Sequence, residues 1–288
     1  MNKWLTGCAV IAIVLPMGAT AMAQMEDVKI TTTKVVDGLY MLQGRGGNIG
    51  VSIGNDGVFL IDDQFAPLTD KITAAVSELS DKPIQYVFNT HLHGDHTGGN
   101  ENLGNQGITI VAHDNVRKRM SDNDSPEAAL PVITFNDKMS FHFNGNDIRV
   151  IHHPHSHTDG DAILHFTNHN VVYTGDLFFN GDYPYVDTKS GGSFDGLIRT
   201  VEKLMTLIDE DTRIIPGHGP LASKKDLQVY LDMLKDVRSK LLVFLNQKLS
   251  LSAVELKDPL QEYDDKWGNG FMKPEVWLKI IYTDMAKQ

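Results

Sequence analysis

Cysteine is almost absent from this sequence, because Cys8 is the only one among 288 residues. A disulfide within the chain needs two cysteines, and structural zinc sites usually combine several thiolates. The shortage therefore excludes a disulfide framework and a cysteine-rich zinc site. If a processed chain also lost Cys8, any metal that it binds would have to be held by nitrogen and oxygen atoms.

Clusters of basic residues are missing as well. The chain has 26 Lys and Arg against 37 Asp and Glu, so its net charge is −11. Nucleic-acid binding depends on grouped Lys and Arg that contact phosphates. We therefore expect a small-molecule substrate and no nucleic-acid partner. No segment repeats at the spacing of a solenoid or a propeller, which favours one compact domain.

Long apolar runs are confined to the N-terminus. There Lys3 precedes an apolar stretch over residues 5–17, and the small residues of Ala21-Met22-Ala23 follow it. This order is typical of a secretory signal peptide, although a buried core helix would share the apolar stretch. We predict a signal peptide at residues 1–23, cleaved before Gln24, and a single domain at residues 24–288. The protein is then periplasmic or secreted.

Removal of the signal peptide would leave a chain without cysteine and with a net charge near −12. Residues 5–8, Leu-Thr-Gly-Cys, resemble a lipoprotein cleavage box. However, the apolar stretch follows that cysteine where it should precede it. We therefore expect no membrane anchor on the mature chain.

The mature chain alternates short β-rich runs with amphipathic helices. Strands are predicted at residues 39–42, 49–53, 57–61, 84–88, 108–112, 148–151, 162–166, 171–174 and 213–215. Helices are predicted around residues 68–79, after Ser193, after Ser223 and from Pro274. Two β-rich halves, each closed by helices, predict an α/β fold in the form of a four-layer αββα sandwich.

Four possible metal ligands lie within six residues: His91, His93, Asp95 and His96. They follow the strand predicted at residues 84–88. In an extended backbone, His91 and His93 point the same way, whereas Asp95 and His96 turn toward a second point after Gly94. One segment is thus able to serve two metal ions.

Three further candidates also follow predicted strands: His157, Asp176 and His218. Imidazole and carboxylate ligands suit zinc, and two three-residue sets that share one carboxylate leave room for water. An open coordination position distinguishes a catalytic metal site from a structural one.

These residues resemble the metallo-β-lactamase superfamily, whose H-x-H-x-D-H motif is matched at residues 91–96. The resemblance extends over about residues 35–235. It implies two zinc ions per chain, one held by His91, His93 and His157, the other by Asp95, His96 and His218, with Asp176 bridging them. It also implies that Asp62 accepts a hydrogen bond from a ligand imidazole, with Asp63 as the competing choice.

Seven other histidines are weaker candidates. His152, His153 and His155 lie close to the third ligand position, but His157 is preferred because Thr158 and Gly160-Asp161 follow it. The remaining four have no motif around them and are interpreted as ordinary surface or core residues: His113, His142, His165 and His169.

The ligand set implies hydrolysis of a carbonyl compound, a β-lactam, lactone or ester, by zinc-activated water, with Asp95 orienting the nucleophile. A mononuclear iron oxygenase and a non-catalytic metal-binding protein are the alternatives, the latter if the loop at residues 181–192 seals the pocket. Glutathione thioesters are disfavoured, because the basic residues that would bind glutathione do not follow Asp176.

Four aromatic residues are expected at the pocket mouth, at least one of them facing solvent: Phe178, Phe179, Tyr183 and Tyr185. Lys189, Ser190 and Ser193 are candidates to hold a substrate carboxylate.

Overall fold

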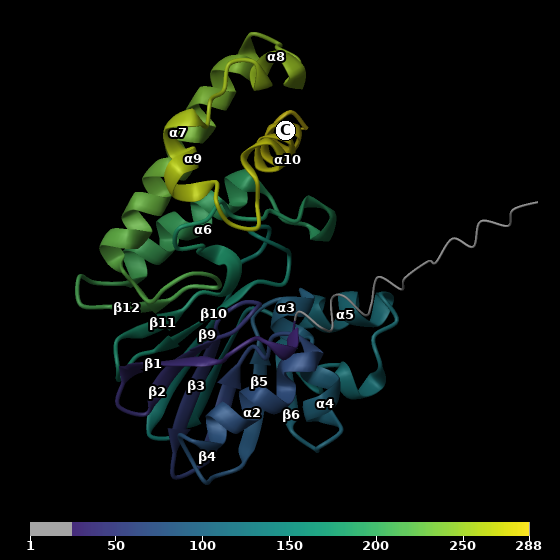
Figure 1. Cartoon of the computed structure of the whole chain (residues 1–288), viewed down its shortest axis with the longest axis vertical. Coiled ribbons are helices and arrows are strands. Elements are labelled where there is room, and N and C mark those ends of the chain that lie inside the picture. Colours follow the sequence, from purple (N-terminus) through teal and green to yellow (C-terminus); the bar gives the residue numbers. More distant parts are fainter. Residues whose placement is uncertain (1–24, 288) are drawn as a thin grey trace, which may run out of the picture.

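Two mixed β-sheets form the centre of the protein in a computed structural model that describes residues 25–287 (Figure 1). The first sheet has seven strands in chain order, antiparallel from β1 to β4 and parallel from β4 to β7. They are β1 (Thr31–Val36), β2 (Leu39–Gln43), β3 (Ile49–Gly54), β4 (Gly57–Ile61), β5 (Ile84–Asn89), β6 (Thr109–His113) and β7 (Ile133–Phe135).

The second sheet has six strands in the order β13-β12-β11-β10-β9-β8. All its neighbours are antiparallel except β11 and β12. They are β8 (Lys138–Phe143), β9 (Asn146–His152), β10 (Ala162–Phe166), β11 (Val171–Tyr173), β12 (Arg213–Ile215) and β13 (Ala222–Ser223).

Helices cover the outer face of each sheet. The first sheet carries α2 (Thr69–Ser77), α3 (Gly94–Thr97), α4 (Asn100–Gly104) and α5 (Asp114–Asp122) in its connections. The helices α6 (Phe194–Leu207), α7 (Lys224–Asn246), α8 (Leu251–Glu255), α9 (Gln261–Trp267) and α10 (Pro274–Met285) gather at the other end of the molecule (Figure 1). No helix within residues 25–287 is long and apolar enough to cross a membrane.

Apolar cores separate these layers. Ile72 and Val76 of α2 pack with Leu60 of β4 on the outer face of the first sheet. Phe59 and Phe88 meet residues of the second sheet between the two sheets. On the far face, residues of α6, α7 and α10 pack against Val172 and Ile214. The predicted αββα sandwich is confirmed.

The predicted helix starts agree with the structure. Ser193 accepts a hydrogen bond from Gly196 N at the start of α6, and Ser223 forms a capping box with Asp226 at the start of α7. Several elements were not predicted from the sequence: the strands β1, β7, β8 and β13 and the helices α4, α5, α8 and α9. The predicted signal peptide, residues 1–23, lies outside the described residues.

Strand ends at one edge of both sheets lead into the loops that carry the candidate ligands. His91 follows β5, His157 follows β9, Asp176 follows β11 and His218 follows β12. The two sheets thus bring residues that are far apart in the chain to one place.

Candidate metal centre

The segment after β5 changes direction at His93, which is extended (φ −69°, ψ 146°) and precedes the short helix α3. Because α3 begins at Gly94, Asp95 and His96 leave the line of the strand. His91 and His93 belong to one group of ligand atoms, and Asp95 and His96 to another. This division agrees with the prediction that one segment serves two metal ions.

The first cluster consists of His91, His93, His157 and Asp176. His93 Nδ1 lies 2.9 Å from His157 Nε2. Asp176 Oδ2 lies 3.4 Å from His157 Nε2 and 3.6 Å from His91 Nε2. Three imidazole nitrogens and one carboxylate oxygen therefore point toward a common centre.

The second cluster consists of Asp95, His96 and His218. Asp95 Oδ2 lies 3.3 Å from His218 Nε2 and 3.6 Å from His96 Nε2. The other oxygen of Asp176, Oδ1, lies 3.0 Å from His96 Nε2 and 3.4 Å from His218 Nε2. Asp176 thus offers one oxygen to each cluster, which is the arrangement of a bridging ligand.

Several of these atoms have no partner in the protein. His91 Nε2, His96 Nε2 and Asp176 Oδ1 are buried and make no hydrogen bond, although the last two are close together. Unpaired polar atoms in the interior are costly, and those in a native structure call for an explanation such as an ion. Imidazole and carboxylate donors in two adjacent sets fit two divalent metal ions.

Asp62 orients His96 from behind. Its Oδ2 lies 2.7 Å from His96 Nδ1 and accepts a hydrogen bond from Tyr173 Oη at 3.0 Å. Thr90 donates to it from both its backbone N and its Oγ1. Asp63 instead accepts from Gly99 N, and within residues 25–287 its side chain makes no hydrogen bond to a ligand imidazole. Of the two acids considered, Asp62 therefore occupies the expected position.

The first cluster has a supporting acid that the sequence analysis missed. Asp187 Oδ2 lies 3.0 Å from His93 Nε2, and the backbone oxygen of Tyr185 lies 2.7 Å from His157 Nδ1. Both residues belong to the loop at residues 181–192. A partner on the outer nitrogen fixes the tautomer and the orientation of an imidazole ligand.

Electrostatics differ between the two clusters. Burial lowers the pKa of His91 well below its usual value and that of His157 to about 4. Burial also lowers the pKa of His96, but Asp176, Asp95 and Asp62 outweigh burial and raise it well above the usual value. The same balance raises the pKa of His218 to about 9. In the absence of metal, burial thus favours the neutral forms of His91 and His157, whereas the neighbouring carboxylates favour the charged forms of His96 and His218.

A glycine-rich loop between β2 and β3 lies directly on the second cluster. A Cβ on Gly47 would lie 2.1 Å from His96 Cε1, and one on Gly46 would lie 2.9 Å from Asp95 Cβ. Gly47 N also donates to Asp95 O. Only glycine permits this close approach.

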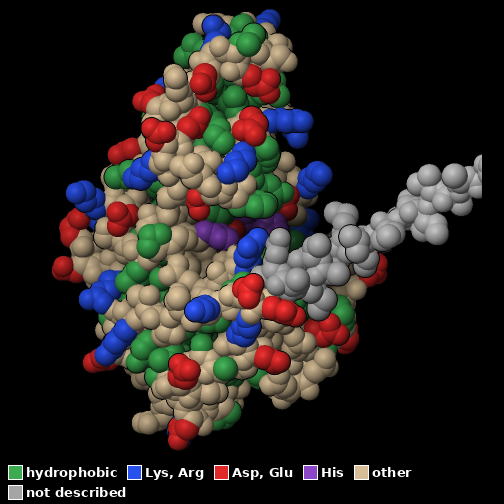
Figure 2. All heavy atoms as spheres, viewed as in Figure 1, with side chains coloured by type: hydrophobic (Ala, Val, Ile, Leu, Met, Phe, Trp, Pro, Cys, Tyr) green, Lys and Arg blue, Asp and Glu red, His purple; other side chains and the backbone are tan. Residues whose placement is uncertain are grey.

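The clusters lie at the bottom of an open pocket of about 750 Å³. Figure 2 shows histidine side chains in this hollow, with hydrophobic side chains above them. The side chains of Asp95 and His218 are 26% and 24% exposed, so the loop at residues 181–192 does not seal the site. The pocket is lined by Met25, Arg45, Phe65, His93, Gly94, Asp95, Asp176, Phe179, Asp182, Tyr183, Tyr185, His218, Phe271 and Met272.

The expectation for the aromatic residues was partly wrong. Phe178 is completely buried in the core on α6 and α7, because consecutive residues of an extended segment point to opposite sides. Phe179 faces the pocket and stacks on the His218 ring, with centroids 4.9 Å apart. Tyr183 and Tyr185 also line the pocket, and Tyr185 is partly exposed as expected.

Lys189, Ser190 and Ser193 do not line the pocket in the described part of the chain, so the expectation that they hold a substrate carboxylate is not supported. Ser193 instead caps α6. None of the other seven histidines belongs to a ligand cluster within residues 25–287. His113, for example, stacks on His152.

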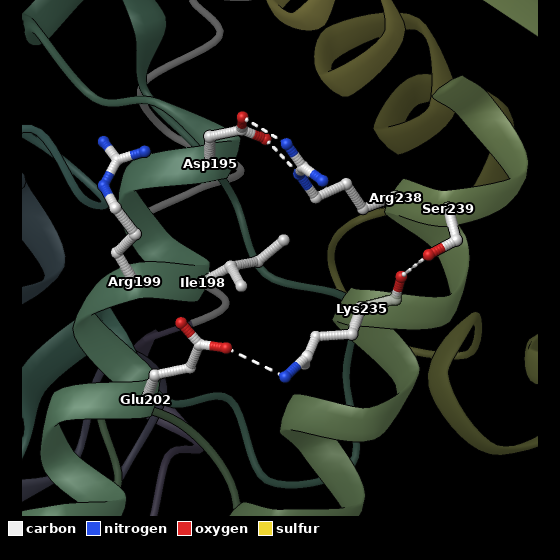
Figure 3. Close-up of a pocket in the computed structure, with 7 residues that line it drawn as sticks. All are labelled: Asp195, Ile198, Arg199, Glu202, Lys235, Arg238 and Ser239. Carbon is white, nitrogen blue, oxygen red and sulfur yellow. Dashed lines mark hydrogen bonds and ion pairs between the residues drawn. The ribbon is translucent and has the colours of Figure 1, made fainter. Parts of the chain in front are cut away.

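A second hollow, between α6 and α7, has a different character (Figure 3). Arg238 pairs with Asp195 and Lys235 pairs with Glu202, whereas Arg199 stands apart from both pairs. These ion pairs join two surface helices. None of the residues that line this hollow belongs to a metal-ligand cluster among the described residues.

Comparison with known proteins agrees with this geometry. The family model described as the metallo-beta-lactamase superfamily matches residues 42–218. The chain belongs to this superfamily. The matched residues include all seven candidate ligands, whereas most of the helical end, α7 to α10, follows them.

Two superfamily members of known structure share the fold. A metallo-beta-lactamase from Pontibacter korlensis superposes with a TM-score of 0.64 at 17% identity, over 72% of this chain and 100% of that chain. The DIM-1 metallo-beta-lactamase gives 0.63 at 17% identity, over 73% and 99%. At this identity the similarity establishes the fold alone.

Curated relatives of similar sequence carry other names. A hydroxyacylglutathione hydrolase from Nitrosococcus oceani is 30% identical over 154 residues, which is 53% of this chain and 55% of the relative. One from Pelagibacter ubique is 28% identical over 50% and 56%. An atrochrysone carboxyl ACP thioesterase from Aspergillus terreus is 32% identical over 48% and 40%. The chain thus spans only about half the length of these relatives.

Proposed function

We propose that this protein is an exported, zinc-dependent hydrolase of carbonyl compounds, with two zinc ions per chain. The observation that carries the proposal is the carboxylate of Asp176, whose two oxygens face the unpaired imidazole nitrogens of His91 and His96, one in each cluster, at the bottom of an open pocket. When bound, two metal ions supply a water of lowered pKa and polarise a carbonyl oxygen. Export rests on the predicted signal peptide.

The residues of the chain have separate tasks in this proposal. Asp95 Oδ2, at the exposed side of the second cluster, orients the attacking water and accepts its proton. Asp62 holds His96, Asp187 holds His93, and the stacked ring of Phe179 holds His218. Apolar side chains of the pocket exclude bulk water from the carbonyl group.

The two alternatives have less support. A mononuclear iron oxygenase needs only one set of ligands, whereas Asp95, His96 and His218 form a complete second cluster. A non-catalytic metal-binding protein would need a sealed pocket, and this one is open. The names of the hydrolase and thioesterase relatives also favour hydrolysis, and they add thioesters to the substrates that need testing.

A parallel hydrolysis screen on zinc-loaded protein tests the proposal. The panel contains nitrocefin, a carbapenem, an acyl-homoserine lactone, an aryl ester, an acylglutathione thioester and a phosphodiester, with Asp95→Asn as the blank. We expect turnover of at least one carbonyl compound and two zinc ions per chain by elemental analysis. Cleavage of the phosphodiester alone, or one iron without zinc, would overturn the proposal.

A further inference from the structure

Arg45 is the only Lys or Arg among the described residues that line the metal-centre pocket. It lies in the loop between β2 and β3, and its side chain is exposed. Within residues 25–287 it takes part in no ion pair, unlike Arg119 and Arg238, which each bind a carboxylate with two nitrogens. A guanidinium keeps its charge at every physiological pH.

The backbone on either side of Arg45 is fixed to the metal-binding segment. Gly46 contacts Asp95, Gly47 contacts His96, and Gly47 N donates to Asp95 O at 3.2 Å. Gln64 Nε2 donates to Gly47 O from the other side at 2.5 Å. Because these contacts hold the loop, the position of Arg45 relative to the metal centre is built into the fold.

The acidic residues that line the pocket form no ion pair with Arg45 in the described structure. Asp95 and Asp176 face the imidazoles of the two clusters. Asp182 is the third acid of the lining, and it lies against Gly270. An unpaired cation in a chain of net charge −11 is available to an anionic ligand.

Apolar side chains form much of the remaining wall. Phe65, Tyr185, Phe271 and Met272 all line the pocket. Phe271 is 89% exposed, which is unusual for so large an apolar side chain. It precedes α10, in the helical end that follows the residues matched by the family model. Such a wall suits the apolar part of a ligand.

We propose that Arg45 determines substrate specificity by binding a carboxylate of the substrate, while an apolar chain or ring lies against Phe65 and Phe271. This inference rests on the proposed hydrolytic function and narrows it. The substrate class is an amphiphilic ester, thioester or cyclic amide that carries one carboxylate away from the reacting carbonyl. A fork of guanidinium nitrogens matches a carboxylate with two hydrogen bonds.

Two esters of matched length test the proposal: mono-4-nitrophenyl adipate, which is anionic, and 4-nitrophenyl hexanoate, which is neutral. Arg45→Ala is expected to lower kcat/KM for the adipate roughly tenfold, mainly through KM, and to leave the hexanoate unchanged. Arg45→Lys should restore part of the preference. Equal changes for both esters, or none, would overturn the proposal.

Arg199→Ala is the matched control, because Arg199 is also exposed, has no ion pair in the described residues and lies in the other hollow. It makes the same change in net charge. We expect it to leave both esters unaffected, so an equal loss in this variant would mean that overall charge, and not Arg45, attracts the anion.

Calorimetry on metal-free protein separates this inference from the proposed hydrolysis. Binding of 6-phenylhexanoate is expected to be roughly tenfold weaker in Arg45→Ala than in the wild type, and binding of 6-phenylhexanol equal in the two. If no ester is hydrolysed, this difference still supports Arg45 while the hydrolytic function fails. Equal binding of the acid by both proteins would overturn the role of Arg45.

Discussion

The first and second clusters share the carboxylate of Asp176, yet the protein surrounds them differently. In the first cluster, burial keeps His91 and His157 neutral, with pKa values below the usual range. In the second cluster, Asp176 and Asp95 raise the pKa values of both His96 and His218 above that range, and Asp62 adds to the effect on His96. Neutral imidazoles are ready to bind a metal ion, whereas charged ones must first lose a proton. The second cluster therefore resembles an ion-pair network until metal displaces the protons.

Removal of an imidazole from the second cluster is expected to have the largest effect. His96→Ala should reduce the zinc content from two ions to about one per chain and abolish most turnover. The fold should persist, because the apolar cores hold the sheets together. Elemental analysis and circular dichroism measure the two properties, with His142→Ala, at an exposed position of β8, as the control. Global unfolding of His96→Ala would mean that the second metal ion is structural.

Asp95→Asn keeps the shape of the second cluster but removes the charge that orients the nucleophile. We expect a loss of at least ~10²-fold in kcat, the scale of a positioned proton acceptor. Steady-state kinetics at saturating zinc, with metal content measured on the same sample, distinguish this role from metal binding. Full activity with both metal ions retained would assign the role to another residue.

Asp187→Asn tests the support of the first cluster. Loss of the carboxylate beside His93 Nε2 should weaken zinc binding at this cluster about 10- to 100-fold and leave the second cluster unchanged. Competition with a chromogenic chelator measures both affinities. Asp211→Asn, an exposed acid far along the chain, is the matched control. Equal weakening of both clusters would contradict a specific role for Asp187.

Asp161 supports the turn of the first cluster, since it accepts hydrogen bonds from Thr158 N and Oγ1 next to His157. Burial raises its pKa to about 7, above the usual 3.8. The folded protein therefore holds the proton of Asp161 more tightly than the unfolded chain does. The resulting contribution to the free energy of unfolding is fully present below about pH 4 and is lost as the pH rises through 7. The free energy of unfolding of metal-free wild type, relative to Asp161→Asn, should fall by up to about 4 kcal/mol over this range.

Denaturant unfolding at several pH values between 4 and 8 measures this difference. A control titration of Asp211→Asn should run parallel to the wild type, because that acid is exposed. A constant difference between wild type and Asp161→Asn would show that Asp161 titrates normally in the folded protein.

The sequence was sufficient for much of the fold because strongly apolar strands and capped helices leave local patterns. The helices after Ser193 and Ser223 begin with side-chain caps that the structure reproduces. By contrast, α5 has the sequence DNVRKRMSD and buries only Val116 and Met120, so its apolar stripe is too short to recognise. The edge strand β1, Thr31–Val36, is mostly exposed, so its sequence shows no alternation of apolar and polar residues that would mark a strand.

The identities of the metal ligands could be predicted from the sequence, because they follow a motif. The structure brings the seven candidates together. Contacts between distant segments were not predictable. Asp187 reaches His93 across 94 positions, and Arg45 comes near the metal centre only because a glycine loop packs on it. The error at Phe178 has a local cause, since one residue along an extended segment separates the core from the pocket.

Asp62 links the metal centre to the packing of the two sheets. This buried residue, in the left-handed region at φ 62°, joins Thr90 at the end of the first sheet, Tyr173 of the second sheet and His96 of the metal centre. Separation of the sheets would break the Tyr173 bond and remove the support of His96. The arrangement of the metal centre thus depends on the packing of the two sheets. We expect the metal ions to be released and the sheets to unfold in a single cooperative transition.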